Sequence, residues 1–248
     1  MSSPANGTGA LDLLDSHGLA EPPIPEVAVV DAGCIWPGIR DRWAVGLARA
    51  AAGADLELSL GEAREWIDDA PRERLIRALT RKTRLEPHIL QPLVSALWGD
   101  FEALALAGAD HPADPGVAPG AAEALVALQS EGCRILIHGP VARALLENHV
   151  DQLDWRRTGL VDGCLGTEDG AVSGTATGRR AGERLGRHPV HGMARVVAST
   201  AAAERAGAGG LAWVVCLGCP PPATSGAPAQ FAANLGEMLA ALLAHELR

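Results

Sequence analysis

Short apolar runs alternate with helix-like segments along most of this 248-residue chain, and this alternation restricts the fold more than any other feature. Runs at 26–30, 133–139, 194–199 and 211–218 have the length and composition of buried strands. Segments with apolar residues at helical spacing separate them. The alternation predicts an α/β fold, with a parallel sheet covered on both faces and ligands bound beyond the carboxyl ends of the strands.

The block after the first strand is longer than one crossover helix. Residues 54–111 keep a helical pattern, with starts suggested by "SLGEAREW" and "DAPRERLIRAL" and breaks at proline and glycine. We therefore expect a helical cap over 54–111, inserted into an α/β core formed by 26–53 and 112–248. Residues 1–25, rich in small residues and proline, are expected to be a flexible tail.

Two later segments carry their own predictions. The glycine-rich stretch 166–182 lacks the Gly-Lys-Ser/Thr ending of a Walker-type phosphate loop, and we expect it to be a flexible surface turn. Residues 228–247 have a helical pattern and are expected to form one final helix.

Composition narrows the class of partner. A formal charge of −9 argues against nucleic acid, whose backbone attracts clustered basic residues. No basic-then-apolar leader and no apolar run near the roughly 20 residues of a membrane span is present, so no membrane partner is expected. Five cysteines, an odd number in mostly apolar segments, indicate reduced thiols and a cytoplasmic location.

Several phrases resemble the haloacid dehalogenase (HAD) superfamily, and within it the phosphonatase-like branch with a helical cap after the first strand. "VAVVDAGCIWPG" (27–38) is similar to the family's first motif, and "CRILIHGPVARALLENHVDQLDWRRTGLVDG" (133–163) to its second. "ARVVASTAAAERAGAGGLAWVVCLG" (194–218) is similar to the fourth-motif strand, helix and next strand. The resemblance implies a HAD-like, Rossmannoid parallel-sheet core.

The chemistry of that family implies an aspartate nucleophile and a hydroxyl at two strand ends. Asp31 fits the nucleophile if one residue is missing before "AGC"; without that gap, Val30 falls at the nucleophile position. His138 stands in place of the hydroxyl. An imidazole can hold an anion or transfer a proton near neutral pH, and a strand-end histidine bonded to nearby backbone is the alternative.

The family also implies a basic residue that stabilises the developing charge. In "SGTATGRRAG", Thr175 replaces the family's arginine, so Arg179 or Arg180 can supply the charge only from a shifted register; a solvated surface arginine is the alternative. Phosphonatases further use a cap lysine to form an imine. The only lysine here, Lys82, does not match that phrase, which disfavours phosphonoacetaldehyde hydrolysis.

An acidic pair that binds the metal completes the family's site. In "ASTAAAE", Ser199 stands where the first aspartate belongs, Ala203 where the second belongs, and Glu204 is one position late. A magnesium ion needs several oxygen ligands. The sequence therefore predicts a degenerate site with no Mg²⁺ and no other cofactor, which removes most of the basis for metal-dependent phosphoryl transfer.

The first function hypothesis is a repurposed, metal-independent enzyme. It acts on a small phosphorylated or sulfated metabolite in a specialised bacterial pathway, such as antibiotic biosynthesis, by leaving-group elimination or ring closure. Its predicted catalytic residues are Asp31, His138 and Ser199. Backbone N–H groups at helix starts can hold an anion, and the predicted substrate-binding residues are Gly33, Cys34, Gly139 and Arg179.

Two alternatives remain open. In one, the protein is a catalytically silent binding or partner subunit that joins a protein partner or a second copy, with an interface on the cap helices that carry Trp66 and Trp98. In the other, Asp31 supports residual HAD-type phosphohydrolase activity.

Overall fold

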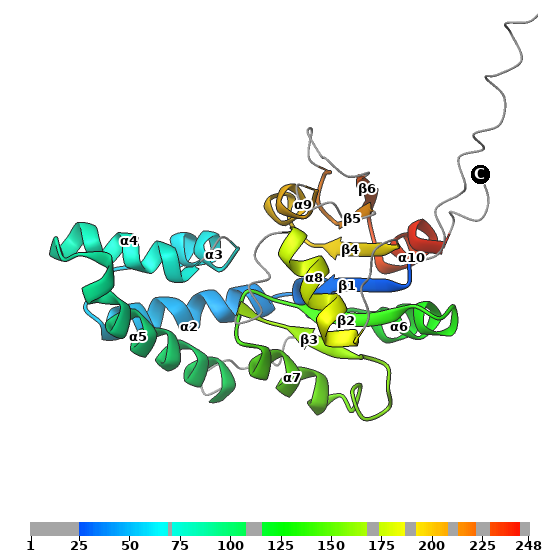
Figure 1. Cartoon of the computed structure of the whole chain (residues 1–248), viewed down its shortest axis with the longest axis horizontal. Helices are drawn as coiled ribbons and strands as arrows, with labels where there is room; N and C mark the ends of the chain where they lie inside the picture. Colours follow the sequence, from blue (N-terminus) through cyan, green and yellow to red (C-terminus); the bar gives the residue numbers. More distant parts are fainter. Residues whose placement is uncertain are drawn as a thin grey trace, which may run out of the picture.

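In the part of the chain that the structure describes, six parallel strands form one sheet in the order β3-β2-β1-β4-β5-β6 (Figure 1). This computed structural model describes residues 25–68, 71–107, 116–167, 174–186, 192–207, 213–221 and 229–243, so nearly all of the expected tail lies outside these ranges. The strands are β1 (Val27–Asp31), β2 (Arg134–His138), β3 (Gly163–Leu165), β4 (Met193–Val197), β5 (Trp213–Leu217) and β6 (Ala229–Ala232). The α/β class with a parallel sheet is confirmed.

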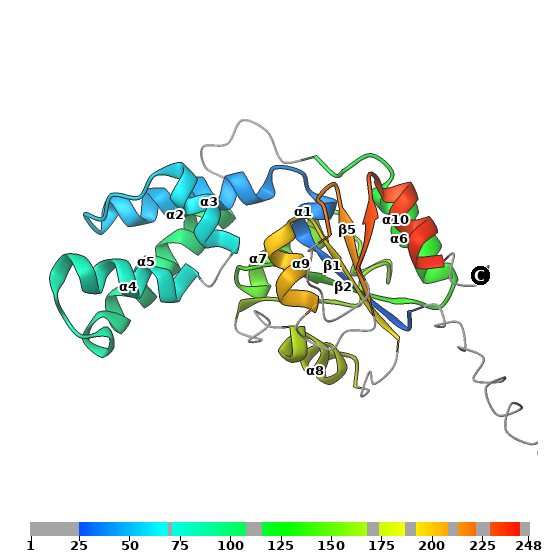
Figure 2. The ribbon, with the colours of Figure 1, turned by 90° about the horizontal axis from the view of Figure 1, so that it is seen from above.

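Helices cover both faces of this sheet, as expected for a parallel sheet. In β1, Ala28 and Val30 face a core shared with α6 (Ala121–Ser130), α7 (Arg143–Gln152) and α10 (Leu235–Leu243). Val27 and Val29 face the opposite side, which α8 (Gly174–Leu185) and α9 (Thr200–Gly207) cover. Figure 2 shows α6 and α10 on one side of the sheet and α8 on the other.

The helical cap extends from the sheet at the carboxyl end of β1 (Figure 1). After the short α1 (Ala32–Ile35), it consists of α2 (Ile39–Gly53), α3 (Leu60–Asp68), α4 (Pro71–Thr83) and α5 (Pro87–Ala107). The start of α3 is the predicted one, because Ser59 and Glu62 each bond the other's backbone N–H, as in a capping box. Helix α2 packs mainly on α3 and α5, so it groups with the helices of the expected cap although it precedes residue 54.

Two predictions about the second half of the chain are wrong in the structure. Part of the expected glycine-rich turn is helix α8, whose Ala181 is buried in the core on the α8/α9 side of the sheet. The expected single helix over 228–247 is strand β6 followed by α10. The segment "AQFA" has little strand propensity, and backbone pairing with β5 decides its conformation.

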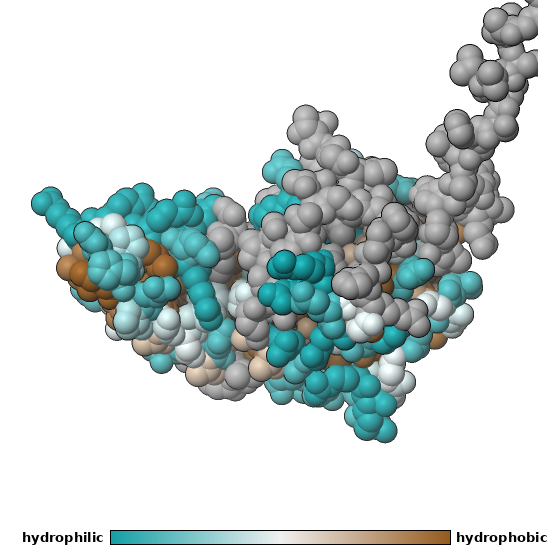
Figure 3. Space-filling view, viewed as in Figure 1, coloured by the Kyte–Doolittle hydropathy of each residue, from teal (hydrophilic) through white to brown (hydrophobic). Residues whose placement is uncertain are grey.

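Exposed apolar side chains gather on the cap. Figure 3 shows hydrophobic surface at the end of the cap farthest from the sheet, beside hydrophilic surface over α4. Among the cap side chains that the structure describes, the large apolar residues more than one third exposed are Leu60, Leu85, Ile89 and Leu93. Trp66 and Trp98, whose helices the alternative of a silent subunit would use as an interface, are 9% and 1% exposed and belong to the core.

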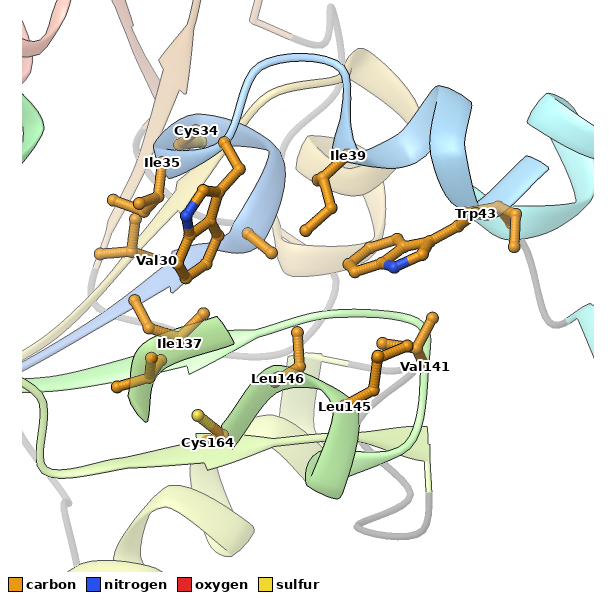
Figure 4. Packing of buried hydrophobic residues seen from close by; sticks show 14 of the residues in the cluster. Val30, Cys34, Ile35, Ile39, Trp43, Ile137, Val141, Leu145, Leu146 and Cys164 are labelled. Carbon is orange, nitrogen blue, oxygen red and sulfur yellow. The ribbon is translucent and has the colours of Figure 1, made fainter. Parts of the chain in front are cut away.

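The cap joins the sheet through a tightly packed contact around Trp43 of α2. Figure 4 shows its ring opposite Val141 and Leu145, next to α7. A Cβ atom on Gly139 would lie 2.9 Å from Leu146 and 3.2 Å from Trp43, so only glycine fits between them without movement. This packing fixes the cap beside the carboxyl ends of β1 and β2.

The cysteines are buried thiols in this fold. All five lie in the described residues and form no disulfides. Among the described residues, no helix combines the length and apolar character needed to cross a membrane.

Candidate functional site

Three ionisable side chains from neighbouring strands meet at the carboxyl end of the sheet. Asp31, the last residue of β1, pairs in register with His138, the last residue of β2. Arg195 lies inside β4, opposite Val29. Because side chains alternate along a strand, all three belong to the side that α8 and α9 cover. The arginine side chain is long enough to span the roughly 7 Å between Val29 and Asp31 along the strand direction.

The polar atoms of these residues, which we call the triad, form a triangle. Asp31 Oδ1 lies 2.9 Å from His138 Nδ1 and 3.2 Å from a terminal nitrogen of Arg195, and those two nitrogens are 3.0 Å apart. A guanidinium only donates and an ionised carboxylate only accepts. We assign the proton of a neutral His138 to Nδ1, so that Nδ1–H and Arg195 both donate to Asp31 Oδ1 and the lone pair of the imidazole lies on Nε2. In this tautomer the 3.0 Å contact between Arg195 and Nδ1 is not a hydrogen bond.

The triad is largely withdrawn from water. The side chains of Asp31, His138 and Arg195 are 16%, 11% and 3% exposed. Burial raises the pKa of Asp31, but the charge of Arg195 and the hydrogen bond from His138 together lower it by more, to about 2. Asp31 is consequently ionised at neutral pH, and its negative charge favours the Nδ1–H tautomer of His138.

A second arginine lies beside the triad. Arg40 of α2 donates to Ser199 Oγ at 3.4 Å, and a Cβ atom on Gly33 would lie 3.1 Å from its Cδ. Burial lowers the pKa of Arg40 and the charge of Asp31 raises it, so the two groups interact electrostatically. Ser199 Oγ also accepts the Ala202 N–H at 3.2 Å and thereby caps α9. Ser199 is thus close to the site and has a structural role.

The other predicted substrate-binding residues have different surroundings. The Gly139 N–H already donates to the Leu165 carbonyl at 3.2 Å. Cys34 is 3% exposed, and burial raises its pKa well above the usual value, so it is a thiol at neutral pH. Arg179 lies on the exposed surface of α8, where its guanidinium is 3.8 Å from Glu183.

Sequence reasoning missed Arg195 and Arg40 because it searched for the family's basic residue in one phrase. A signal for Arg195 was present: it is the only charged residue in the predicted strand "ARVVAS", which the fold class covers on both faces. A charge in such a position requires a partner. Arg40 carried no comparable signal, because an arginine near the start of an amphipathic helix is usually solvated.

The residues around Asp31 do not fit a magnesium ion. Among the described residues, no group of three or more His, Cys, Asp or Glu side chains is arranged to hold a metal. Ser199 caps a helix, Ala203 is buried and Glu204 is exposed, so the loop after β4 adds no carboxylate to the site. Arg195 already places a positive charge against Asp31 Oδ1.

The shifted pKa of Asp31 predicts how stability depends on pH. Because its pKa falls from 3.8 to about 2 on folding, ionised Asp31 contributes about 2 kcal/mol above pH 4. This contribution is lost as the pH falls from about 4 to about 2. We expect the free energy of unfolding, measured in urea, to fall between pH 5 and pH 2 by about 2 kcal/mol more in the wild type than in Asp31→Asn. Equal losses in both proteins would contradict the assignment.

Comparison with known proteins gives the fold but not a function. No protein-family model matches the sequence, and the search of curated proteins finds no match. Among solved structures, 75 chains match. One, a predicted phosphatase from Clostridium acetobutylicum, has a TM-score of 0.64 and 11% identity over 90% of this chain and 100% of its own.

Two further solved structures match this chain with similar TM-scores and similarly low sequence identity. A predicted phosphoglycolate phosphatase from Haemophilus somnus has a TM-score of 0.60 and 16% identity over 88% of this chain and 97% of its own. A protein described as a haloacid dehalogenase-like hydrolase from Bacteroides fragilis has a TM-score of 0.60 and 15% identity over 86% and 99%. The chain therefore has a HAD-like α/β fold of the Rossmann-like type.

Proposed function

We propose that this chain is a metal-independent acid–base enzyme that acts on a small phosphorylated or sulfated metabolite, and that it derives from the phosphonatase-like branch by loss of the metal-binding motifs. One observation carries the proposal: Asp31 is ionised and orients His138 through Nδ1, at the strand ends where ligands bind in α/β folds. A carboxylate that fixes the tautomer of a histidine is a common way to prepare a general base.

The proposed reaction is an elimination or a ring closure. His138 Nε2 accepts a proton from a carbon or a hydroxyl of the substrate, and the electron pair left behind forms a new double bond or a new ring bond. The carbon–oxygen bond to the phosphate or sulfate breaks, and that group leaves with the bonding pair. Arg40, which interacts electrostatically with Asp31 and donates to Ser199, supplies further positive charge that favours an anionic substrate. A specialised bacterial pathway remains the proposed setting.

A substrate panel in EDTA tests this proposal. Purified protein is incubated with phosphate and sulfate esters that carry an acidic hydrogen on the carbon next to the ester carbon, and released phosphate or sulfate is measured. We expect turnover without metal, and His138→Gln is expected to lower kcat by about 10²–10⁴-fold. His88→Gln, an exposed histidine of the cap, is the matched control and should keep full activity.

The outcomes separate this function from its alternatives. Turnover that requires Mg²⁺ and disappears in Asp31→Asn would favour residual phosphohydrolase activity instead. Against that activity, Asp31 Oδ1 accepts two hydrogen bonds, and a carboxylate with a pKa of about 2 is a weak nucleophile. No turnover of any ester and no ligand-induced rise in Tm would favour a silent subunit. The exposed side chains Leu85, Ile89 and Leu93 are the observation that favours that second candidate.

A further inference from the structure

A cleft on the cap is lined by several positively charged side chains, and none of its lining residues belongs to the triad. It has a volume of about 610 Å³ and lies along α4, with contributions from α3 and the start of α5. The residues that line it are Trp66, Arg74, Ile76, Arg77, Thr80, Arg81 and Pro87. Three of these are arginines, and none is acidic. We call it the cap cleft.

The arginines of the cap cleft share one face of α4. Positions 74, 77 and 81 have the i, i+3, i+7 spacing that aligns side chains along a helix, and they extend over about 10 Å. The helix has five basic side chains and one acidic side chain, Glu73, although the whole chain has a charge of −9. The positive charge is therefore local to this helix and opposes the net charge of the protein.

Two of these arginines have only backbone acceptors in the described part of the chain. Arg77 Nε donates to the Glu73 carbonyl and Arg81 Nε to the Arg77 carbonyl, each at 3.4 Å. Such bonds hold the side chains along the helix and neutralise no charge. Two guanidinium groups of this kind in one cleft attract an anion with more than one negative charge.

Thr80 supplies an independent observation. Thr80 lines the cap cleft, and its hydroxyl oxygen is buried and has no hydrogen-bond partner among the described residues. Helical threonines commonly bond the carbonyl four residues earlier, as Thr83 does with Leu79 at 2.8 Å. A buried polar group without a partner is costly. A ligand oxygen beside Thr80 would give this hydroxyl the partner that it lacks among the described residues.

We propose that the cap cleft is a binding site for a small molecule that carries a diphosphate group. Arg77 and Arg81 pair with the two phosphates, and Thr80 donates to a phosphate oxygen. Trp66, Ile76 and Pro87 give the cleft apolar walls against which the organic part of such a ligand packs. The site uses none of the residues of the triad, and it does not depend on the function proposed for His138.

Calorimetric titration of the full-length protein with inorganic pyrophosphate tests this site. We expect saturable one-to-one binding, about tenfold tighter than binding of inorganic phosphate. The double variant R77Q/R81Q should weaken pyrophosphate binding by about tenfold or more. R156Q/R157Q removes two arginines from the core surface, makes the same change in net charge and should alter binding by less than about threefold.

Thr80→Val distinguishes a ligand contact from a structural role. Because the hydroxyl has no hydrogen-bond partner among the described residues, the substitution should leave Tm unchanged or raised while weakening pyrophosphate binding by about threefold. His138→Gln should bind as the wild type does, whatever its effect on catalysis. The proposal is overturned if pyrophosphate fails to saturate the protein by about 10 mM, or if R77Q/R81Q and R156Q/R157Q have equal effects.

Discussion

Replacement of Asp31 by alanine is expected to lower the free energy of unfolding by about 3 kcal/mol. The substitution leaves the guanidinium of Arg195, which is 3% exposed, without the carboxylate that lies 3.2 Å away. Removal of one member of a buried ion pair is costly because the remaining charge stays buried without the opposite charge that offset its desolvation. Urea unfolding at pH 7 measures the change, and m-values equal to the wild type's support a two-state comparison.

A double-mutant cycle separates this electrostatic loss from lost packing. Arg195→Met removes the charge and keeps much of the side-chain volume. If the two residues form the pair described, Asp31→Ala/Arg195→Met should be more stable than the sum of the single changes predicts, by at least about 1 kcal/mol. Asp41→Asn is the control, because Asp41 pairs with Arg64 on the exposed surface and should matter little. Additive effects at Asp31 and Arg195 would refute a coupled pair.

Replacement of Trp43 by alanine is expected to be at least as costly, at about 3–5 kcal/mol. Trp43 is 1% exposed and packs where the cap meets the sheet, opposite Val141 and Leu145 (Figure 4). Removal of the indole leaves a cavity at this contact, so the cap should also loosen. We expect faster hydrogen exchange in α2 in addition to the loss measured by urea unfolding.

Trp43→Phe is the matched control for this position. The indole N–H of Trp43 is buried and has no hydrogen-bond partner among the described residues, so phenylalanine removes a costly unpaired donor while it keeps an aromatic ring. The loss should therefore be about 1 kcal/mol or less. If Trp43→Phe were as destabilising as Trp43→Ala, the position would depend on the N–H and not on filled volume.

Much of the fold could be predicted because its signal is local. The apolar run that becomes β1 and the Ser59–Glu62 pair that starts α3 act over a few residues, and they appear in the structure as expected. The errors occurred where long-range pairing competes with local preference. Strand β6 is rich in alanine and reads as helix, but its backbone pairs with β5.

The candidate site was predictable in part for the same reason. Asp31 and His138 end two apolar runs, and parallel strands bring such ends together, so their proximity follows from the sequence pattern. Their bond at 2.9 Å and the position of Arg195 beside them do not. The bond depends on the register of β2 against β1, and the position of Arg195 depends on the register of β4 against β1. No residue of these strands encodes either register by itself.

By itself, the sequence determined the alternation of strands and helices and the insertion of several helices after the first strand. Only the tertiary structure decided which cation lies against Asp31 and which arginines line the cap cleft. The physical reason is the separation along the chain over which each interaction acts. Hydrophobic periodicity and capping act between residues close in the chain, whereas an ion pair across 164 residues forms only when strand order and register have placed both side chains in one buried space.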